Sequence, residues 1–456
     1  MAKLDLGKPE KFVLAHFLIR NFWFLFWFKV WYKRVTIVGK KNLDRKTPTI
    51  LAINHQNTAM DPLALCGTIF RDITWLARAD LYKKKALLPI FHTLKILPIF
   101  RQRDGLKSLE DNNLVFEKVV EVLTAKRLVG LFPEGTHWGF RRLRQTRKAI
   151  PRIIHLAEEK NNFDLDMNVN PVGIYYDDYV EVRTNLFVKI GEPIPMRQYL
   201  ASLKENPQVA ENEIRESIER GMKANMIDIP QMDETYNTVD SLRLICRNQT
   251  SSRFPAIGNR QEQAFSADKK TIELIENQET AQQGYIASLK PLVDSYEEKR
   301  AALKFPYDLI ENNGDDAFHI IWNCMKSIVL LPIFLLGVCL CALPYWGMCK
   351  LGKTLAKDIL FRNSIMFVGG LLIVTLVHLV LAILWLIFAP FPWWSVFIFV
   401  LGITLLWPVF IDYPKLLKLT AQEFRFNFGL LKKDANILEI CTLRDKIKEE
   451  YAKLLR

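Results

Sequence analysis

This sequence has few cysteines, and they are not arranged to form disulfides or to bind a metal. The seven of them form no Cys-x-x-Cys pair, and none has a histidine nearby at metal-ligand spacing. Isolated thiols in or beside apolar runs are typical of reduced residues in a core or a membrane. The sequence therefore argues against a disulfide-stabilised class and predicts no metal site. The positions are Cys66, Cys246, Cys324, Cys339, Cys341, Cys349 and Cys441.

The N-terminal region lacks an apolar stretch long enough to span a membrane. Its uninterrupted apolar run, Phe22 to Phe28, is too short for that. No small-residue cleavage site follows, so we expect no signal peptide. Residues 12–32 are instead rich in Phe and Trp, interrupted by basic side chains. This pattern predicts an interfacial membrane-binding helix within residues 1–34. The alternative is a helix that packs on the protein's own core.

Acidic residues are in the minority. Lys and Arg number 62 against 49 Asp and Glu, which gives a net charge of +13, and half of the residues are apolar. Such a chain suits either nucleic acid or an anionic membrane surface. Because it has no nucleic-acid-binding motif, we expect membrane lipids as partners and no nucleic acid. One basic cluster without an acid is either a solvated helix face or a phosphate-binding patch. It consists of Arg141, Arg142, Arg144, Arg147, Lys148 and Arg152.

An imidazole and a carboxylate lie close together in the run Asn-His-Gln-Asn-Thr-Ala-Met-Asp-Pro, which contains His55 and Asp61. An imidazole held by a carboxylate can take a proton from a substrate hydroxyl. At about 100° per residue, positions six apart on one helix point away from each other, so the segment must bend for the two to meet. Pro62 suits the first turn of a helix and Asp61 its N-cap, which places His55 in the preceding loop. Alternatively, Asp61 only caps the helix and His55 is a surface residue.

Two further stretches carry groups that suit a phosphorylated substrate. The sequence Phe-Pro-Glu-Gly-Thr, residues 132–136, follows an apolar run that predicts a buried strand. Its glycine lets backbone N–H groups approach a ligand beside Glu134. A second short strand, Ile96 to Phe100, ends in Arg101 and Arg103, whose guanidiniums match phosphate oxygens in a bidentate way. A proton acceptor, a phosphate clamp and a glutamate turn are the parts needed to acylate a phosphorylated alcohol.

These blocks, in this order, resemble those of the PlsC-type glycerolipid acyltransferases, which acylate glycerol 3-phosphate and lysophospholipids. That family has a His…Asp block, a block ending in arginine, a Phe-Pro-Glu-Gly-Thr block and a Val-Pro-Val-like block. The resemblance covers residues 35–195. The matching segments are His55 to Asp61, Pro98 to Arg101, Phe132 to Thr136 and Asn170 to Gly173.

The resemblance implies a role for individual residues. It makes His55 the general base and Asp61 the carboxylate that orients it, while Arg101, Glu134 and Gly135 bind the glycerophosphate. The basic cluster would then meet lipid headgroups or the phosphate-bearing carrier of the acyl donor. The other residues that we expect to bind substrate are Arg103, Thr136, Arg142 and Lys148.

Two positions depart from the family pattern. Five residues separate His55 from Asp61, whereas most members have four. The longer spacing also occurs in fungal-type glycerol-3-phosphate acyltransferases and related bacterial sequences. His137 follows Thr136 at a position where many relatives have an arginine.

Three functions stay open. The first is transfer of a fatty acyl group to glycerol 3-phosphate, which the longer His–Asp spacing and the predicted C-terminal hairpin favour by family likeness. The second is acylation of 1-acyl-glycerol 3-phosphate or another lysophospholipid. The third is a non-catalytic membrane protein that binds lipid headgroups. For an enzyme we expect no cofactor, and acyl-CoA, an acyl carrier protein thioester or an acyl phosphate as the co-substrate. The sequence indicates neither the donor nor the oligomeric state.

The pattern of apolar runs predicts an α/β acyltransferase domain, a sheet surrounded by helices, over residues 35–195. Residues 196–315 have fewer apolar residues and more Glu and Gln, which predicts a polar helical insert or linker domain. The expected strands are Val35–Val38, Thr49–Ile53, Thr74–Ala77, Leu128–Phe132, Val169–Ile174 and Leu186–Ile190.

Residues 316–411 form a predicted membrane region, followed by a basic helical tail over 412–456. Residues 365–388 carry no formal charge and are long enough to span. They form a predicted transmembrane helical hairpin with residues 395–411, around a proline- and tryptophan-rich tip. We expect Pro332 and Pro344 to break the apolar stretch 327–348, which would make it re-entrant or interfacial.

Basic residues flank the hairpin, and its tip has none. The loop 350–362 and the tail after Ile411 are both rich in Lys and Arg. The positive-inside rule therefore predicts an integral membrane protein with its catalytic domain on the cytoplasmic face. The membrane would be a bacterial inner membrane, or the endoplasmic reticulum in a eukaryote.

Overall fold

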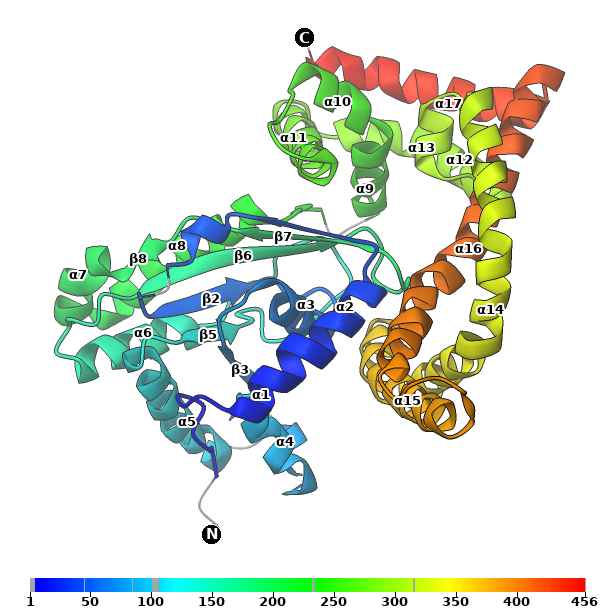
Figure 1. The fold of residues 1–456 in the computed structure, drawn as a ribbon. Coiled ribbons are helices and arrows are strands. Elements are labelled where there is room, and N and C mark those ends of the chain that lie inside the picture. The colour runs from blue at the N-terminus through cyan, green and yellow to red at the C-terminus, as the bar shows by residue number, and fades with distance from the viewer. Residues whose placement is uncertain are drawn as a thin grey trace. The chain divides into compact units, whose positions relative to one another are not determined.

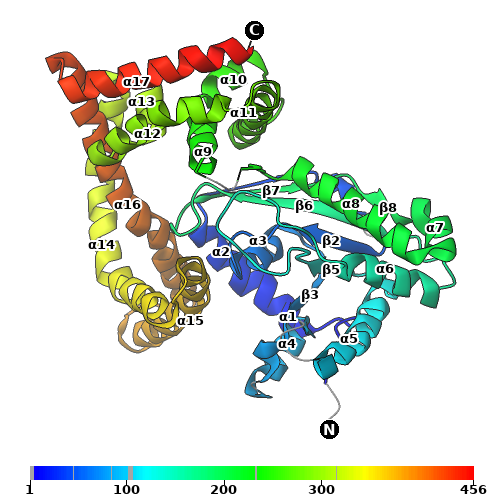
Figure 2. The same cartoon turned by 180° about the vertical axis from the view of Figure 1, so that it is seen from behind.

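The computed structural model describes residues 5–44, 46–83, 85–100, 106–231, 234–314 and 316–455. The chain divides into two compact units (Figures 1 and 2). The first contains Met1–Met226 and Gly352–Phe367, and the second contains Ile227–Leu351 and Val368–Arg456.

A mixed sheet forms the centre of the first unit, in the order β1-β7-β6-β2-β5-β3-β4, with β8 paired to β6. β6 runs antiparallel to β7 and β8, and the other neighbouring strands are parallel. Each of the six expected runs overlaps one of these strands. The bounds are β1 (Arg34–Val38), β2 (Thr49–Ile53), β3 (Ile73–Arg78), β4 (Ile96–Ile99), β5 (Leu128–Leu131), β6 (Asn168–Tyr176), β7 (Asn185–Ile190) and β8 (Ile194–Pro195).

Helices surround this sheet, which confirms the predicted α/β class (Figure 1). The central strand β2 is buried along its whole length, as expected of a strand covered on both faces. Apolar side chains of α5, α6 and α8 form one core with β2, β5 and β6. The helices are α3 (Met60–Thr68), α4 (Leu88–Thr93), α5 (Leu106–Thr124), α6 (Ala149–Lys160), α7 (Leu200–Glu205) and α8 (Pro207–Asn225).

The first unit extends further along the chain than residue 195, the end predicted from the sequence for the α/β domain. Helix α8 buries Ile214, Ile218 and Met222 in the core of the first unit. These residues recur every four positions, so a mostly polar helix still presents one apolar stripe. The sequence reading missed this stripe because the overall composition of the segment is polar. The predicted boundary at 195/196 is therefore wrong, and the first unit continues to Met226.

The N-terminal aromatic segment forms α1 (Leu14–Leu18), a π-helical stretch η1 (Ile19–Phe24) and α2 (Leu25–Trp31). One face packs on the first unit, where Trp27 and Trp31 are buried, and the other face leaves Phe17 and Phe22 exposed. The buried face matches the alternative of a helix packed on the protein's own core, and membrane binding by the exposed face stays a prediction. Its Arg20 guanidinium donates hydrogen bonds to the backbone carbonyls of residues 66, 69 and 70, at the C-terminal end of α3.

The polar segment is helical in the second unit, as predicted. Its helices are joined through a buried cluster in which Arg243 and Arg247 both pair with Asp268. The last helix, α17, packs against α12, α13 and α9. The bounds are α9 (Tyr236–Ile245), α10 (Arg247–Arg253), α11 (Arg260–Ala281), α12 (Tyr285–Leu303), α13 (Tyr307–Glu311) and α17 (Ala435–Ala452).

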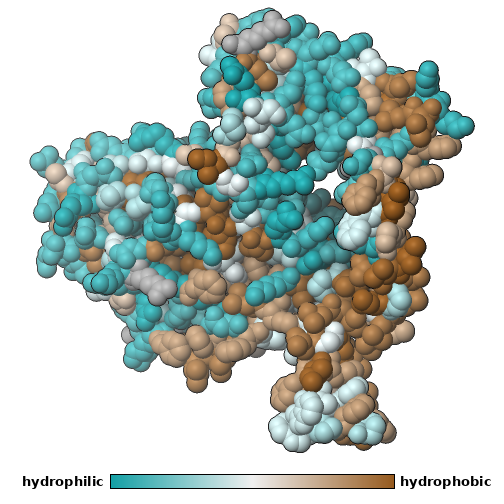
Figure 3. Space-filling model, turned by 45° about the horizontal axis from the view of Figure 1, so that its top comes forward, coloured by the Kyte–Doolittle hydropathy of each residue, from teal (hydrophilic) through white to brown (hydrophobic). Residues whose placement is uncertain are grey.

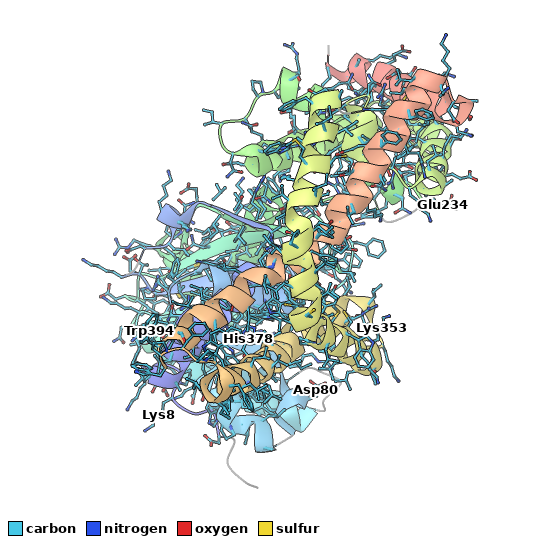
Figure 4. The ribbon with its side chains drawn as sticks, turned by 45° about the vertical axis from the view of Figure 1, so that its right-hand side comes forward. Lys8, Asp80, Glu234, Lys353, His378 and Trp394 are labelled. Carbon is cyan, nitrogen blue, oxygen red and sulfur yellow. The ribbon has the colours of Figure 1, made fainter. Side chains whose placement is uncertain are left out.

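Three helices of the described chain are long and apolar enough to cross a membrane: α14 (Ala317–Leu355), α15 (Ile359–Phe388) and α16 (Ser395–Lys432). Figure 3 shows an extended apolar surface, coloured brown, where these helices lie. Helices α15 and α16 are joined at a tip that contains Trp394, and His378 lies part of the way along α15 (Figure 4). The tip is closed by a hydrogen bond of 2.8 Å from Trp385 Nε1 to Ser395 Oγ.

The expectation that Pro332 and Pro344 break the stretch 327–348 is wrong. Helix α14 continues through both prolines. Each proline removes one backbone donor, but packing against α16 offsets the loss. The rings of Phe334 and Tyr413 stack with centroids 4.4 Å apart, and Tyr345 contacts Phe410 edge-on. The path of this helix through a bilayer stays a prediction.

The packing of α8 on β6 can be tested at Gly173. A Cβ atom there would lie 1.7 Å from the backbone carbonyl oxygen of Asn225. We expect Gly173→Ala to destabilise the first unit by about 1–3 kcal/mol through overpacking. A Cβ atom at Gly402 in α16 would have no neighbouring atom within 4 Å, so Gly402→Ala is the matched control. Thermal unfolding in detergent measures both, and a wild-type melting temperature for Gly173→Ala would contradict this packing.

Candidate active site

The candidate active site lies at the carboxyl ends of two neighbouring parallel strands. β2 and β5 pair with Ala52 opposite Leu131, so the segments that leave the two strands meet at one edge of the sheet. His55 follows β2, and Glu134 follows β5. Loops at this edge are where α/β folds place their chemical groups. The topology therefore brings together two blocks that are far apart in the sequence.

The loop between β2 and α3 bends as predicted, so that His55 and Asp61 meet. Thr58 turns the chain between them with a left-handed φ of 47°. The expected N-cap position of Asp61 is wrong, because Ala59 is the N-cap and Asp61 lies in the first turn of α3. A carboxylate in the first turn still interacts favourably with the positive end of the helix dipole.

The Asp61 carboxylate is fully buried and accepts three hydrogen bonds. His55 Nδ1 and the backbone amide of Asn57 lie 2.9 Å from Oδ2, and the Tyr176 hydroxyl lies 3.0 Å from Oδ1. Burial raises the pKa of Tyr176 well above its usual value, so this hydroxyl keeps its proton and donates it. Three donors suit an ionised carboxylate. With Nδ1–H bonded to Asp61, Nε2 of His55 is the nitrogen that can accept a proton.

Neighbouring groups fix the position of His55. Its backbone amide donates to Glu134 Oε1 over 2.8 Å, and its carbonyl accepts from the backbone amide of Trp138 over 3.4 Å. Its ring stacks on Phe132 with centroids 4.3 Å apart. The side chain keeps partial exposure, 17 %. The imidazole is therefore held by its backbone, its face and one nitrogen, while the ring remains accessible.

Glu134 is buried behind His55 and is not open to a substrate. Its second oxygen, Oε2, accepts from the backbone amide of Arg144 over 3.1 Å, so both oxygens are bonded to backbone amides. Burial raises the pKa of Glu134 to about 8, and the two amide hydrogen bonds oppose this rise. The arrangement differs from the substrate contact that the family resemblance implied. Glu134 therefore joins the loop between β2 and α3 to the start of the basic cluster.

The structure describes some of the other predicted substrate-binding residues but not all of them. Arg101 and Arg103 lie outside the described residues. Gly135 is exposed with φ 73°, but its amide donates to the carbonyl of Phe132 over 3.1 Å and so closes the turn. Thr136 follows it and is half-buried. The exposed part of this turn therefore lies directly beyond Glu134.

The basic cluster lies in the segment between this turn and α6. Arg141 lies over the ring of Tyr179, with its guanidinium carbon 5.2 Å from the centroid. The Arg142 carbonyl accepts from Trp138 Nε1 over 3.1 Å, and its side chain is half-buried. Lys148 immediately precedes α6 and is also half-buried. Aromatic rings thus order part of the cluster, and the cluster remains cationic.

Sequence reasoning missed three groups that complete the site. Tyr176 donates to Asp61, Asn57 supplies an amide to it, and Phe132 supports the His55 ring. Phe132 and Asn57 lie within the blocks already singled out. Tyr176 lies at the end of β6, which pairs with β2. A polar side chain at the end of that strand is the sequence feature that could have indicated it. Among the residues that the structure describes, no group of three His, Cys, Asp or Glu side chains could hold a metal ion.

Comparison with known proteins defines the class of the domain. Residues 34–175 match the protein-family model described as Acyltransferase. The chain is 24% identical over 148 residues to "Glycerol-3-phosphate O-acyltransferase 1" of Saccharomyces cerevisiae, an alignment that covers 32% of this chain and 19% of that protein. The chain therefore spans about a fifth of the length of this curated relative.

Among solved structures, the chain is similar to the 1-acyl-sn-glycerophosphate (LPA) acyltransferase PlsC from Thermotoga maritima. The TM-score is 0.32 and the sequence identity 19%, over 46% of this chain and 82% of that chain. The domain over residues 34–175 thus matches an acyltransferase family model, and the ordered blocks within it resemble those of the PlsC-type glycerolipid acyltransferases.

The buried position of Glu134 predicts how stability depends on pH. Its folded pKa of about 8 lies above its ordinary value of 4.5, so between these values the unfolded chain has lost a proton that the folded chain keeps. Stability from this group should therefore fall as pH rises from 4.5 to 8, by at most about 1.4 kcal/mol per pH unit. Glu134→Gln should remove this slope from melting temperatures measured across that range.

The exposed Glu192 provides the control, because Glu192→Gln changes the same chemical group outside the site. That variant should keep the wild-type slope. Equal slopes for wild type and Glu134→Gln would show that the carboxyl is not buried in its proton-bound form.

Proposed function

We propose that the protein is a membrane-bound O-acyltransferase that moves a fatty acyl group onto a glycerol-phosphate acceptor in phospholipid synthesis. The observation that carries this proposal is the 2.9 Å contact between His55 Nδ1 and the buried carboxylate of Asp61. It supports a role for His55 as a general base, because the contact leaves Nε2 to accept the proton of a hydroxyl. The match of residues 34–175 to the Acyltransferase family model supports the reaction class.

The reaction needs no acyl-enzyme intermediate, because the acceptor hydroxyl is itself the nucleophile. Nε2 of His55 takes the hydroxyl proton as the oxygen attacks the carbonyl carbon of the acyl donor. The bond from that carbon to the thioester sulfur, or to the oxygen of an acyl phosphate, then breaks. The leaving group then receives this proton from the imidazolium. Asp61 stabilises the imidazolium while it exists and holds the tautomer that makes Nε2 the base.

The acceptor phosphate is proposed to bind at the arginine block and the basic cluster. Arg101 and Arg103 supply guanidiniums by family likeness, and Arg142 and Lys148 add positive charge beyond the glutamate turn. Gly135, which has no side chain, leaves the exposed part of this turn uncovered, and Thr136 supplies a hydroxyl there. Cationic groups suit a phosphate because each hydrogen bond to it is charge-assisted.

Glycerol 3-phosphate is the acceptor we favour. The five-residue spacing between His55 and Asp61 and the similarity to the yeast glycerol-3-phosphate O-acyltransferase support this choice. The second candidate is 1-acyl-sn-glycerol 3-phosphate or another lysophospholipid. The donor is proposed to be acyl-CoA, an acyl carrier protein thioester or an acyl phosphate, with no further cofactor.

A protein that only binds lipid headgroups would not need a base aligned by a buried carboxylate. Burying the Asp61 charge is costly unless it is fully hydrogen-bonded. In this site three donors, one of them His55, form hydrogen bonds to the Asp61 carboxylate and offset the cost of its burial. This arrangement favours the enzyme over the non-catalytic alternative.

The reaction can be tested with labelled acyl donor and purified membranes, by supplying glycerol 3-phosphate and its 1-acyl form side by side. We expect transfer to glycerol 3-phosphate, and a loss of about 10²- to 10⁴-fold in His55→Ala, as for other general bases. Tyr176→Phe, which removes only a donor to Asp61, should lose less. Transfer to the 1-acyl form alone would identify that form as the acceptor. Turnover retained in His55→Ala would exclude His55 as the general base.

We propose that the active site faces the cytoplasm, with α15 and α16 crossing the membrane as a hairpin over residues 365–388 and 395–411. The segment Gly352–Phe367 belongs to the same compact unit as His55. It carries Lys353, Lys357 and Arg362 against one acidic residue, Asp358. The excess of positive charge supports a cytoplasmic location for this segment, and so for the active site.

Sidedness can be measured with an epitope tag in sealed membranes. A tag inserted in the tip 389–394 should bind antibody from the non-cytoplasmic side. A tag at the N-terminus should bind only from the cytoplasmic side, which makes it the control within one experiment. Both tags accessible from the same side would contradict a hairpin that crosses with the active site in the cytoplasm.

A further inference from the structure

The segment that leads into the apolar helix α15 contacts the catalytic loop. Within the first unit, residues 358–364 lie against the segments that carry Thr58 and His137. The hydrogen bond between His137 and Asp358 joins residues 221 positions apart in the sequence. No acyltransferase block includes this segment, so nothing in the motif pattern assigns it a role.

Asp358 contacts the second histidine of the site. His137 Nε2 lies 3.1 Å from Asp358 Oδ2, and the His137 ring meets the His55 ring edge-on with centroids 5.7 Å apart. Burial acts to raise the pKa of Asp358, but the hydrogen bonds from His137 and the Leu360 amide outweigh it and lower the pKa. The carboxylate is therefore ionised at neutral pH and suited to hold an imidazole. A second histidine–aspartate pair thus supports the edge of the catalytic ring.

Ser364 contacts the bend in the catalytic loop. Thr58, whose left-handed conformation allows His55 to face Asp61, places its Oγ1 2.8 Å from Ser364 Oγ and 3.3 Å from the carbonyl of Leu360. Both hydroxyls are buried. A non-glycine residue in this conformation carries strain that its surroundings must offset. The start of α15 supplies these surroundings.

A third contact joins the same two segments. The backbone carbonyl of Tyr179 accepts from the side-chain amides of both Asn57 and Asn363, over 3.2 and 2.9 Å. The Asn57 backbone amide also donates to Asp61. The catalytic loop and the start of α15 are therefore held to one common acceptor.

We propose that Asp358 and Ser364 are positioning residues for the acyl transfer, and that the start of a membrane helix completes the active site. The inference rests on the proposed function. Asp358 acts through His137 on the edge of the His55 ring, and Ser364 acts through Thr58 on the bend that brings His55 to Asp61. Neither residue touches the reacting atoms. Their loss should therefore lower kcat and leave the acceptor KM nearly unchanged, because the alignment of the base matters in the transition state.

A double-mutant cycle tests the pair. His137→Ala and Asp358→Ala should each lower kcat about tenfold, and the double variant should also lose only about tenfold, because contacting residues are not additive. Independent effects would multiply to about a hundredfold, and that result would overturn the assignment. Full activity in either single variant would overturn it as well.

A second variant separates positioning from folding. Asp358 Oδ1 also accepts from the Leu360 amide over 2.9 Å and so supports the first turn of α15. Asp358→Ser keeps an oxygen that can cap the helix, but the side chain is too short to hold His137. It should therefore lose as much kcat as Asp358→Ala. Recovery of wild-type kcat in Asp358→Ser would reduce the role of Asp358 to a helix cap.

Matched controls lie in the second unit. Asp434 caps α17 by accepting from the backbone amides of Asn436 and Ile437, so Asp434→Ala removes a similar cap away from the site and should keep wild-type kcat. Ser364→Ala should lower kcat about threefold, within the range seen for single hydrogen bonds. Ser327→Ala removes a buried hydroxyl that is bonded within α14, and it should leave kcat unchanged. Equal kcat values for Ser364→Ala and wild type would overturn the role of Ser364.

The outcome also separates this inference from the proposed function. A wild-type protein that transfers no acyl group to either acceptor would overturn the function itself. An active wild type with multiplicative losses in the cycle would overturn only the positioning role of Asp358.

Discussion

The contact between the Asp61 carboxylate and the His55 imidazole is the constraint on which the site depends. A buried charge is stable only when its hydrogen-bonding capacity is used, so the fold must deliver three donors to one place. They are His55 and the Asn57 amide, both in the loop between β2 and α3, and Tyr176 at the end of β6. The left-handed Thr58 follows from the same requirement, because His55 and Asp61 could not meet along a regular helix.

Around this contact the structure uses backbone amides where the motif suggests side-chain chemistry. Glu134 is part of the Phe-Pro-Glu-Gly-Thr block, yet both of its oxygens accept hydrogen bonds from backbone amides of the protein itself. It fixes the positions of two loops relative to β2 and β5, which pair in parallel. The family blocks therefore combine two kinds of residue, those that perform the chemistry and those that hold them in place. Only the geometry tells the two kinds apart.

The sequence was sufficient for what is local. His55, Asp61 and the bend between them follow from six positions of spacing, and each expected strand follows from a short apolar run. Tyr176 and Asp358 could not be found in this way, because their partners lie 115 and 221 positions away in the chain. Helix α14 continues through its prolines because neighbouring helices compensate, an effect of packing that no single-chain pattern contains. The role of Arg101 rests on family likeness alone.

The way α15 is shared between the two units has a consequence for dissecting the protein. A fragment that ends at Met226 would carry all four sequence blocks and the complete sheet, and would look self-sufficient. It would nevertheless lose the backbone carbonyl of Phe367 that accepts from Trp27 Nε1, and the ring of Phe367 that packs on Phe24 and Trp31. Aromatic surface normally covered by the returning chain would then face water. A fragment without the long apolar helices would therefore be missing a piece of its own interior.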